Sequence, residues 1–76
     1  MTKAFVLISC VLGKEEEIIE NLKHTDYVKE IQGTFGAFDI IATIENKNND
    51  KIRKTVKRCI ENIWSVRSTL TLIGTK

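Results

Sequence analysis

The chain has 76 residues and a formal net charge of +2, so it forms one small domain without the basic excess of a dedicated nucleic-acid binder. A core of this size is marginal alone and usually gains stability from a partner. Two cysteines without a Cys-x-x-Cys spacing and a single histidine give no support for a zinc or redox motif, so we expect no cofactor and no metal.

The apolar run 4–12 near the N-terminus bears on location. It is too short to span a membrane and lacks the small-residue cleavage site of a signal peptide. We therefore expect a cytoplasmic chain with no membrane partner. In that compartment we favour buried free thiols for Cys10 and Cys59 over a disulfide between them.

The first half of the chain predicts a strand, a helix and a second strand. Residues 5–12 (FVLISCVL) are rich in β-branched residues and mostly apolar on both faces, so this strand should be covered on both sides. Residues 14–24 predict a helix with three glutamates in its first turn and cationic residues in its last turn. Residues 27–33 predict a weaker, more exposed strand.

The second half predicts a strand, a longer helix and a final strand. Residues 38–45 alternate, with one wholly apolar face. Residues 50–63 predict a helix capped by Asn48 or Asn49. Its apolar stripe comprises Ile52, Val56, Cys59, Ile60 and Ile63. On the last strand, residues 66–73, one face is expected to hold Val66, Ser68, Leu70 and Leu72, and the other Arg67, Thr69, Thr71 and Ile73.

The order β-α-β-β-α-β predicts an α+β, ferredoxin-like fold in a single domain, residues 1–76. Right-handed crossovers place both helices on one face of a four-stranded antiparallel sheet. The helix-free face should then expose an apolar patch that includes Ile41 and Ile73. We infer a homodimer joined through that face.

Several residues leave their function open. The second helix carries the cationic residues Lys51, Arg53, Lys54, Lys57 and Arg58. They could form a phosphate or nucleic-acid surface, a solvated helix face, or a contact with the acidic first helix of another subunit. A small cofactor-free enzyme of this topology would need His24, Tyr27 and Trp64 to converge in one cavity. Alternatively, His24 caps its helix, and the two aromatic residues are lids over the core.

The segment 33–39 (GTFGAFD) predicts a sharp turn between two strands. A glycine turn offers unobstructed N–H donors, and Asp39 offers an acceptor, which together suit a free amino acid. The alternative is that Asp39 satisfies amides of its own turn. Thr69 and Thr71 could likewise bind a polar ligand or reflect β-propensity alone.

These features together resemble the Lrp/AsnC family, in particular its C-terminal effector-binding domain, called RAM (regulation of amino acid metabolism). Gly36, Phe38 and Asp39 match the family pattern of a glycine, one variable residue, an aromatic and an aspartate. Residues 67–71 resemble its arginine-threonine-x-threonine run on the last strand. The resemblance covers essentially the whole chain.

The resemblance implies a stand-alone regulatory module without the helix-turn-helix domain, not an enzyme and without direct nucleic-acid contact. It implies a dimeric α+β barrel with sheets face to face, commonly assembled into a ring of dimers such as an octamer. Small amino acids would bind between dimers, and the module could act on full-length Lrp/AsnC regulators by co-assembly.

Carried over residue by residue, the resemblance makes Gly36, Ala37, Phe38 and Asp39 the ligand contacts, with Thr69 and Thr71 secondary. One departure is Phe35, where many members of the family have threonine. A bulky ring in place of a hydroxyl bears on which ligand fits. A purely structural oligomerisation module remains the third function class.

Overall fold

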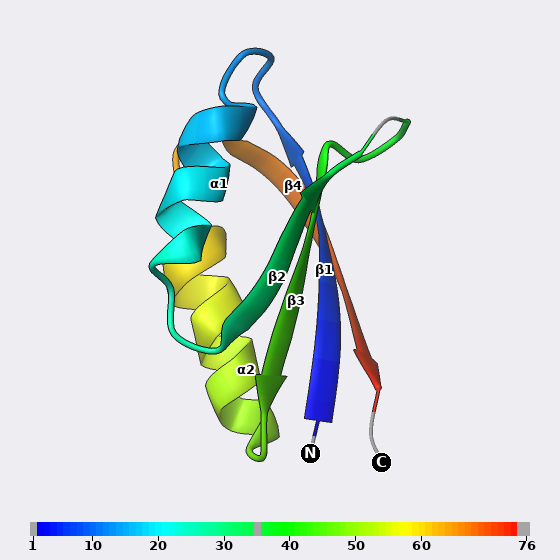
Figure 1. Ribbon diagram of the computed structural model, residues 1–76, viewed down its shortest axis with the longest axis vertical. Coiled ribbons are helices and arrows are strands. Elements are labelled where there is room, and N and C mark those ends of the chain that lie inside the picture. The colour runs from blue at the N-terminus through cyan, green and yellow to red at the C-terminus, as the bar shows by residue number, and fades with distance from the viewer. Residues whose placement is uncertain (1, 35, 75–76) are drawn as a thin grey trace.

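The fold places the first strand at the centre of the sheet. The computed structural model describes residues 2–34 and 36–74. Its elements are β1 (Thr2–Cys10), α1 (Glu15–Lys23), β2 (Val28–Gly33), β3 (Ile40–Asn46), α2 (Asn49–Thr55), the π-helical turn η1 (Val56–Ile60) and β4 (Val66–Gly74). The strands form one antiparallel sheet in the order β2-β3-β1-β4, and both helices cover the same face (Figure 1). The predicted ferredoxin-like fold is confirmed.

The core lies between the helices and one face of the sheet. Along β1 every second residue from Thr2 to Cys10 is buried, as expected for a strand whose alternate side chains point to opposite faces. The hydrophobic core comprises Ala4, Val6, Ile8, Cys10, Ile18, Leu22, Ile40, Ala42, Ile44, Ile52, Val56 and Ile60. These side chains come from the two central strands, β1 and β3, and from α1, α2 and η1, so one layer of helices closes a single core.

The helix-free face exposes an apolar surface, which we call the open-face patch. It consists of Phe5, Leu7, Ile41, Leu70 and Leu72. Leu7 pairs with Ile41 on one side and Leu70 on the other, and Phe5 pairs with Leu72. Phe5, Leu70 and Leu72 are 42%, 48% and 53% exposed. The predicted apolar patch is present on the face that the helices leave uncovered.

The expectation that Ile73 joins this patch is wrong. Ser9 pairs with Ser68, whereas Cys10 pairs with Val66, so Arg67 is an extra residue that forms a β-bulge. Val66 therefore packs against the core, and the faces of β4 are not those predicted by simple alternation. Ile73 pairs with Ala4 and lies on the helix side.

The second helix differs from the prediction in its last turns. Asn48 caps it as expected, because its side chain accepts a hydrogen bond from the Asp50 N–H at 2.8 Å. Beyond Thr55 the helix widens into η1, where the Glu61 N–H bonds the Val56 carbonyl five residues back. In this segment Val56 and Ile60 are buried, whereas Cys59 is exposed. The predicted stripe, and the predicted burial of both thiols, are therefore wrong at Cys59.

The loops at one end of the sheet expose apolar side chains. β1 ends at Cys10, two residues earlier than predicted, and Leu12 is 92% exposed. Trp64 is 75% exposed, with the Lys14 amine 5.5 Å from its ring centroid, so the expectation of a core lid is wrong for this residue. Tyr27 does pack against the core. Within residues 2–34 and 36–74, no helix has the length and apolar character needed to cross a membrane.

The register of η1 is testable with adjacent substitutions. Ile60→Ala should lower the free energy of unfolding by about 2–5 kcal/mol, because it empties a fully buried site. Cys59→Ala should change it by less than about 0.5 kcal/mol, because the side chain is exposed. Urea unfolding followed by circular dichroism, at one protein concentration, measures both. Equal losses would indicate an ordinary α-helix with both residues on the stripe.

Candidate functional site

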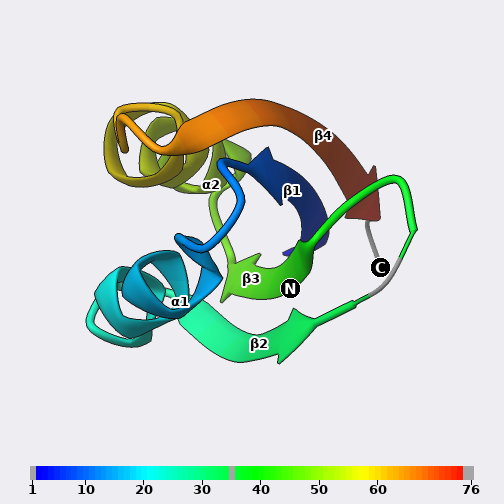
Figure 2. The ribbon, with the colours of Figure 1, turned by 90° about the horizontal axis from the view of Figure 1, so that it is seen from above.

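The turn between β2 and β3 projects from the helix-free side of the sheet (Figures 1 and 2). Two bonds from Thr34 close it: its N–H donates to the Asp39 carbonyl at 2.8 Å, and its hydroxyl donates to the Phe38 carbonyl at 2.7 Å. Sequence reasoning missed this role of Thr34. The available signal was a hydroxyl residue directly after the strand, where side-chain bonds to a turn backbone are common.

Asp39 anchors the turn to the central strand. Its N–H donates to the Ile8 carbonyl at 2.8 Å, and its Oδ2 accepts the Cys10 N–H at 2.9 Å. The β1–β3 pairing ends at Ile8 and Ile40, so the Asp39 carboxylate supplies the acceptor for the amide of Cys10 beyond that point. The carboxylate therefore serves β1 and, among the described residues, no backbone amide of its own turn. This long-range bond uses one of its two oxygens.

The tip of the turn is accessible. Gly36 has φ of +121°, a left-handed conformation that favours glycine, as predicted for this position. Gly36 and Ala37 are exposed, whereas Phe38 and Asp39 are half-buried. Phe35, the residue that departs from the family pattern, lies outside the described residues. The four predicted primary contacts thus form one contiguous surface segment with backbone at the tip and a carboxylate at the base.

The predicted secondary contacts lie elsewhere in the same chain. Thr69 pairs with Ile8 and Thr71 with Val6, so both threonines are on the helix side of β4. The Thr69 hydroxyl lies 3.5 Å from the Glu61 carboxylate. Because the turn projects from the opposite side, the structure brings 36–39 together but places the two threonines on the other face of the sheet.

The Cys10 thiol shares the base of this turn. Burial raises its pKa, and the charges of Asp39 and Glu15 and a hydrogen bond with Asp39 raise it further. The thiol therefore stays protonated at neutral pH and acts as a packing group. In the described part of the chain, no group of three His, Cys, Asp or Glu side chains could hold a metal ion.

The three residues required by an enzyme of this topology are dispersed. His24 is the C-cap of α1, and its Nε2 lies 3.9 Å from the Glu20 carboxylate at the surface. Tyr27 lies near the end of β3, because its carbonyl accepts the Glu45 N–H. Trp64 lies beyond the end of β1, because the carbonyl of the next residue, Ser65, accepts the Val11 N–H. Because β1 and β3 are antiparallel, these are opposite ends of the sheet. No convergent set supports the enzyme hypothesis.

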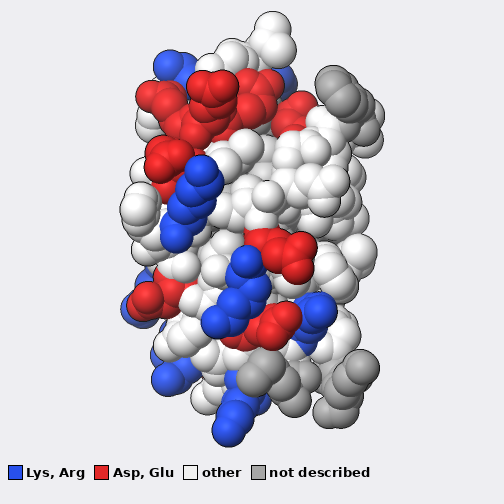
Figure 3. Space-filling view, viewed as in Figure 1, with Lys and Arg blue, Asp and Glu red and all other residues white. Residues whose placement is uncertain are grey.

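The charged helix faces are solvent-exposed. Figure 3 shows acidic side chains gathered over α1, whose first turn holds Glu15, Glu16 and Glu17. On the second helical segment Arg53, Lys54, Lys57 and Arg58 are exposed. The two helices thus present faces of opposite charge to solvent.

Comparisons with known proteins identify the class. The family model of the Lrp/AsnC ligand binding domain matches residues 3–76. The chain belongs to this family. A curated relative, the HTH-type transcriptional regulator FL11 of Pyrococcus abyssi, is 32% identical over 73 residues, which cover 96% of this chain and 48% of the relative. The chain thus spans about half the length of that relative.

Solved structures agree with this assignment. A hypothetical protein from Pyrococcus horikoshii superimposes with a TM-score of 0.93 at 28% identity, covering 100% of this chain and 92% of that one. A transcriptional regulator from Neisseria meningitidis, solved as a complex with L-Met, superimposes with a TM-score of 0.85 over 99% of this chain and 50% of its own length. At 14% identity the latter comparison shows the fold alone.

The raised pKa of Cys10 predicts a loss of stability at alkaline pH. Above the ordinary thiol pKa of 9.0 the unfolded chain loses this proton while the folded chain keeps it. Stability should therefore be unaffected by this group below pH 9 and fall above it, by at most about 1.4 kcal/mol per pH unit, until the folded thiol also ionises. Urea unfolding between pH 7 and 10.5 measures the slope.

Cys10→Ala is the comparison for this prediction. The variant is less stable throughout, because it removes buried volume, but it lacks the titrating thiol. Its stability should decline less steeply above pH 9 than that of the parent. Parallel declines would contradict the assignment of the slope to Cys10.

Proposed function

We propose that this chain is a regulatory module that binds a small amino acid at the 36–39 turn. Membership of the Lrp/AsnC ligand-binding family supports an amino-acid-responsive, regulatory role. The observation that carries the proposal is the position of Asp39, whose carboxylate is fixed by the Cys10 N–H at the base of an exposed glycine turn. We place the module in the cytoplasm, with no enzymatic activity.

The chemistry of the turn suits a zwitterion. The backbone at Gly36 and Ala37 is exposed, and N–H groups in such a turn can receive the ligand carboxylate. The Asp39 carboxylate is the group we assign to the ligand ammonium, because its two oxygens can accept further hydrogen bonds besides those from the Cys10 N–H and thiol. The L-Met complex of the Neisseria regulator, a protein with the same fold, is consistent with a ligand of this size.

The proposed site is completed by a second chain. Thr69 and Thr71 lie on the helix side of an edge strand, so they would reach a ligand at the turn only from a neighbouring subunit. We therefore propose a ring of dimers, such as an octamer, with one ligand at each junction between dimers. Co-assembly with full-length Lrp/AsnC regulators would then carry the signal to DNA-bound complexes.

The proposed dimer is joined through the open-face patch. Phe5, Leu70 and Leu72 are large apolar residues between 42% and 53% exposed on the face without helices. Each buried apolar side chain contributes roughly 1.5–3 kcal/mol before entropy is subtracted, less here because burial is already partial. Pairing two such faces covers the second side of β1 and enlarges a core that is marginal for 76 residues.

Isothermal titration with the twenty amino acids tests the effector site. Asp39→Asn should weaken binding by roughly tenfold or more, because it removes the charge that pairs with the ammonium. The substituted side chain still offers an oxygen to the Cys10 N–H, so the fold is retained. Asp26→Asn, the same change at an exposed loop position, is the matched control and should bind as the parent does.

Two outcomes would count against the effector role. One is no binding of any of the twenty amino acids, either by the chain alone or together with a full-length regulator. The other is equal binding by the parent and Asp39→Asn. A particle size that is the same with and without amino acids, in the absence of binding, would instead favour a purely structural oligomer.

Light scattering coupled to size-exclusion chromatography tests the dimer face. Leu72→Lys should convert dimers to monomers, because it places a charge in the centre of an apolar interface. Ile73→Lys changes the neighbouring residue on the other face of β4 and should leave the dimer intact. The dimer face would be wrong if Leu72→Lys remained dimeric or if both variants dissociated equally.

A further inference from the structure

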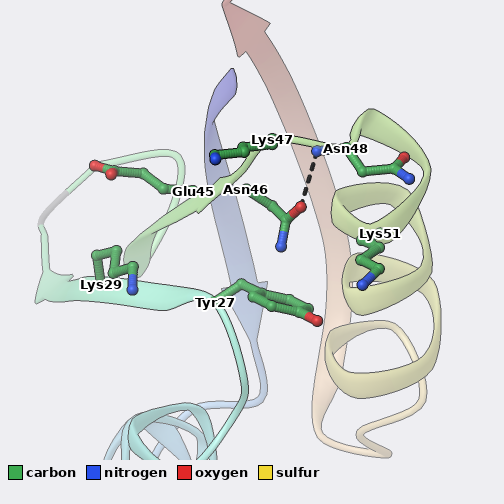
Figure 4. A pocket seen from close by; sticks show the side chains of 7 residues that line it. All are labelled: Tyr27, Lys29, Glu45, Asn46, Lys47, Asn48 and Lys51. Carbon is green, nitrogen blue, oxygen red and sulfur yellow. Dashed lines mark hydrogen bonds between the residues drawn. The ribbon is translucent and has the colours of Figure 1, made fainter. Parts of the chain in front are cut away.

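A depression lies at the opposite end of the sheet from the turn. It has a volume of about 600 Å³ and is formed by the start of β2, the end of β3 and the start of α2. Its lining consists of Tyr27, Lys29, Glu45, Asn46, Lys47, Asn48 and Lys51 (Figure 4). β3 begins at the turn and ends here, which separates the two regions by ~20 Å at the rise of an extended strand. This depression is therefore distinct from the proposed effector site.

The lining carries an excess of positive charge. Lys29, Lys47 and Lys51 come from three different segments, and all three are exposed. The one carboxylate, on Glu45, lies 3.5 Å from the Lys3 amine and is directed away from the Tyr27 ring in Figure 4. Its charge is thus partly neutralised outside the depression, so the three lysines set the sign of the local field.

Two asparagines add hydrogen-bond donors to this wall. The Asn46 Oδ1 accepts the Asn48 N–H at 2.8 Å, and the Asn48 Oδ1 accepts the Asp50 N–H at 2.8 Å. Because each side-chain oxygen is bound to the backbone, the orientation of each amide is fixed and its NH₂ group is turned away from that bond. In Figure 4 the Asn46 amide nitrogen and the Lys51 amine are both directed toward the Tyr27 side chain. The wall is therefore rich in donors.

Tyr27 fixes the shape of the depression at a conformational cost. Its φ of +71° is a left-handed conformation that is rare for a bulky L-residue and costs about 1–3 kcal/mol. The Glu45 N–H holds its carbonyl at 3.0 Å, and its ring packs against the core. The strained backbone thereby sets an aromatic ring and a hydroxyl between the lysines of β2 and α2.

We propose that this depression binds a small molecule bearing a phosphate or diphosphate group. Three lysines that approach from separate segments suit a compact anion with several oxygens, and lysine is a common point-charge ligand of phosphate. Amide and phenol donors match the remaining phosphate oxygens. The volume admits a ligand of metabolite size. The inference does not depend on amino-acid binding at the turn.

Pyrophosphate is the probe for this site. Titration calorimetry gives the affinity, and amide resonances in heteronuclear NMR spectra locate the site, with perturbations expected at Tyr27, Lys29 and 45–51. ATP should bind at the same residues and adenosine should not, if phosphate is the group recognised. Citrate separates phosphate recognition from general anion binding, because a site without preference for phosphate would bind citrate as tightly as pyrophosphate. Equal affinity for the two anions would overturn the assignment.

Matched double variants test the lysines. Lys29→Gln with Lys51→Gln should weaken pyrophosphate binding by roughly tenfold or more, because it removes two charge-assisted hydrogen bonds. Lys54→Gln with Lys57→Gln makes the same charge change at exposed residues outside the lining and should weaken binding clearly less, because these lysines make no hydrogen bond to a ligand in the depression. All four lysines are exposed, so both variants should fold.

The proposal is overturned if the two double variants weaken binding equally. It is also overturned if no resonance of a lining residue shifts with pyrophosphate or ATP. A third contrary outcome is that the shifts spread along the basic helix face and that a single-stranded RNA binds more tightly than pyrophosphate. Asp39→Asn should bind pyrophosphate as the parent does. Failure of this site and failure of the effector site are therefore separately observable.

Discussion

The constraint on which the structure depends is that β1 has two apolar faces and only one layer of helices. Its inward residues, from Ala4 to Cys10, fill the core beneath the helices. Its outward residues Phe5 and Leu7 join Ile41, Leu70 and Leu72 on a face that no helix among the described residues covers. A second copy of the chain supplies an identical apolar face that can pack against it. Self-association is therefore the simplest way for this sequence to remove that surface from water.

The same strand positions the proposed effector site. Beyond Ile8, β1 leaves its regular pairing on both sides: the ladder with β3 stops at Ile40, and the ladder with β4 is interrupted by the bulge at Arg67. The Cys10 amide at this point would be costly to bury without an acceptor. The Asp39 carboxylate provides that acceptor, and in doing so it ties a glycine turn to a central strand of the sheet. A binding segment held in this way is partly ordered before any ligand arrives, which lowers the entropy lost on binding.

The types and order of the elements were predictable from the sequence because the spacing of apolar residues and the positions of the turn glycines agree with the fold along most of the chain. The errors fall where one residue is inserted into a regular pattern. The π-turn shifts the last part of the second helix, so Cys59 is exposed although four- and three-residue spacing places it on the stripe. The bulge at Arg67 likewise changes the alternation on β4, so Val66 lies on the same face as Thr69 and Thr71 and not on the face of Ser68. Both insertions are set by tertiary packing and leave no local signal. The four contiguous turn residues were identifiable by motif, whereas the pairing of Asp39 with Cys10, 29 positions away, required the fold.

The two interpretations of Asp39, as a structural acceptor and as a ligand contact, do not exclude one another. A carboxylate can accept about four hydrogen bonds, and the Cys10 N–H and thiol supply two of them. These bonds orient the group, so the fold restricts the direction in which it can accept a further hydrogen bond. Loss of the side chain would therefore remove a ligand contact and leave a strand amide without its acceptor, at a cost of about 1–3 kcal/mol. A truncation to alanine would confound these two effects. Asparagine separates them, because it keeps an oxygen for the amide while removing the charge that an ammonium group requires.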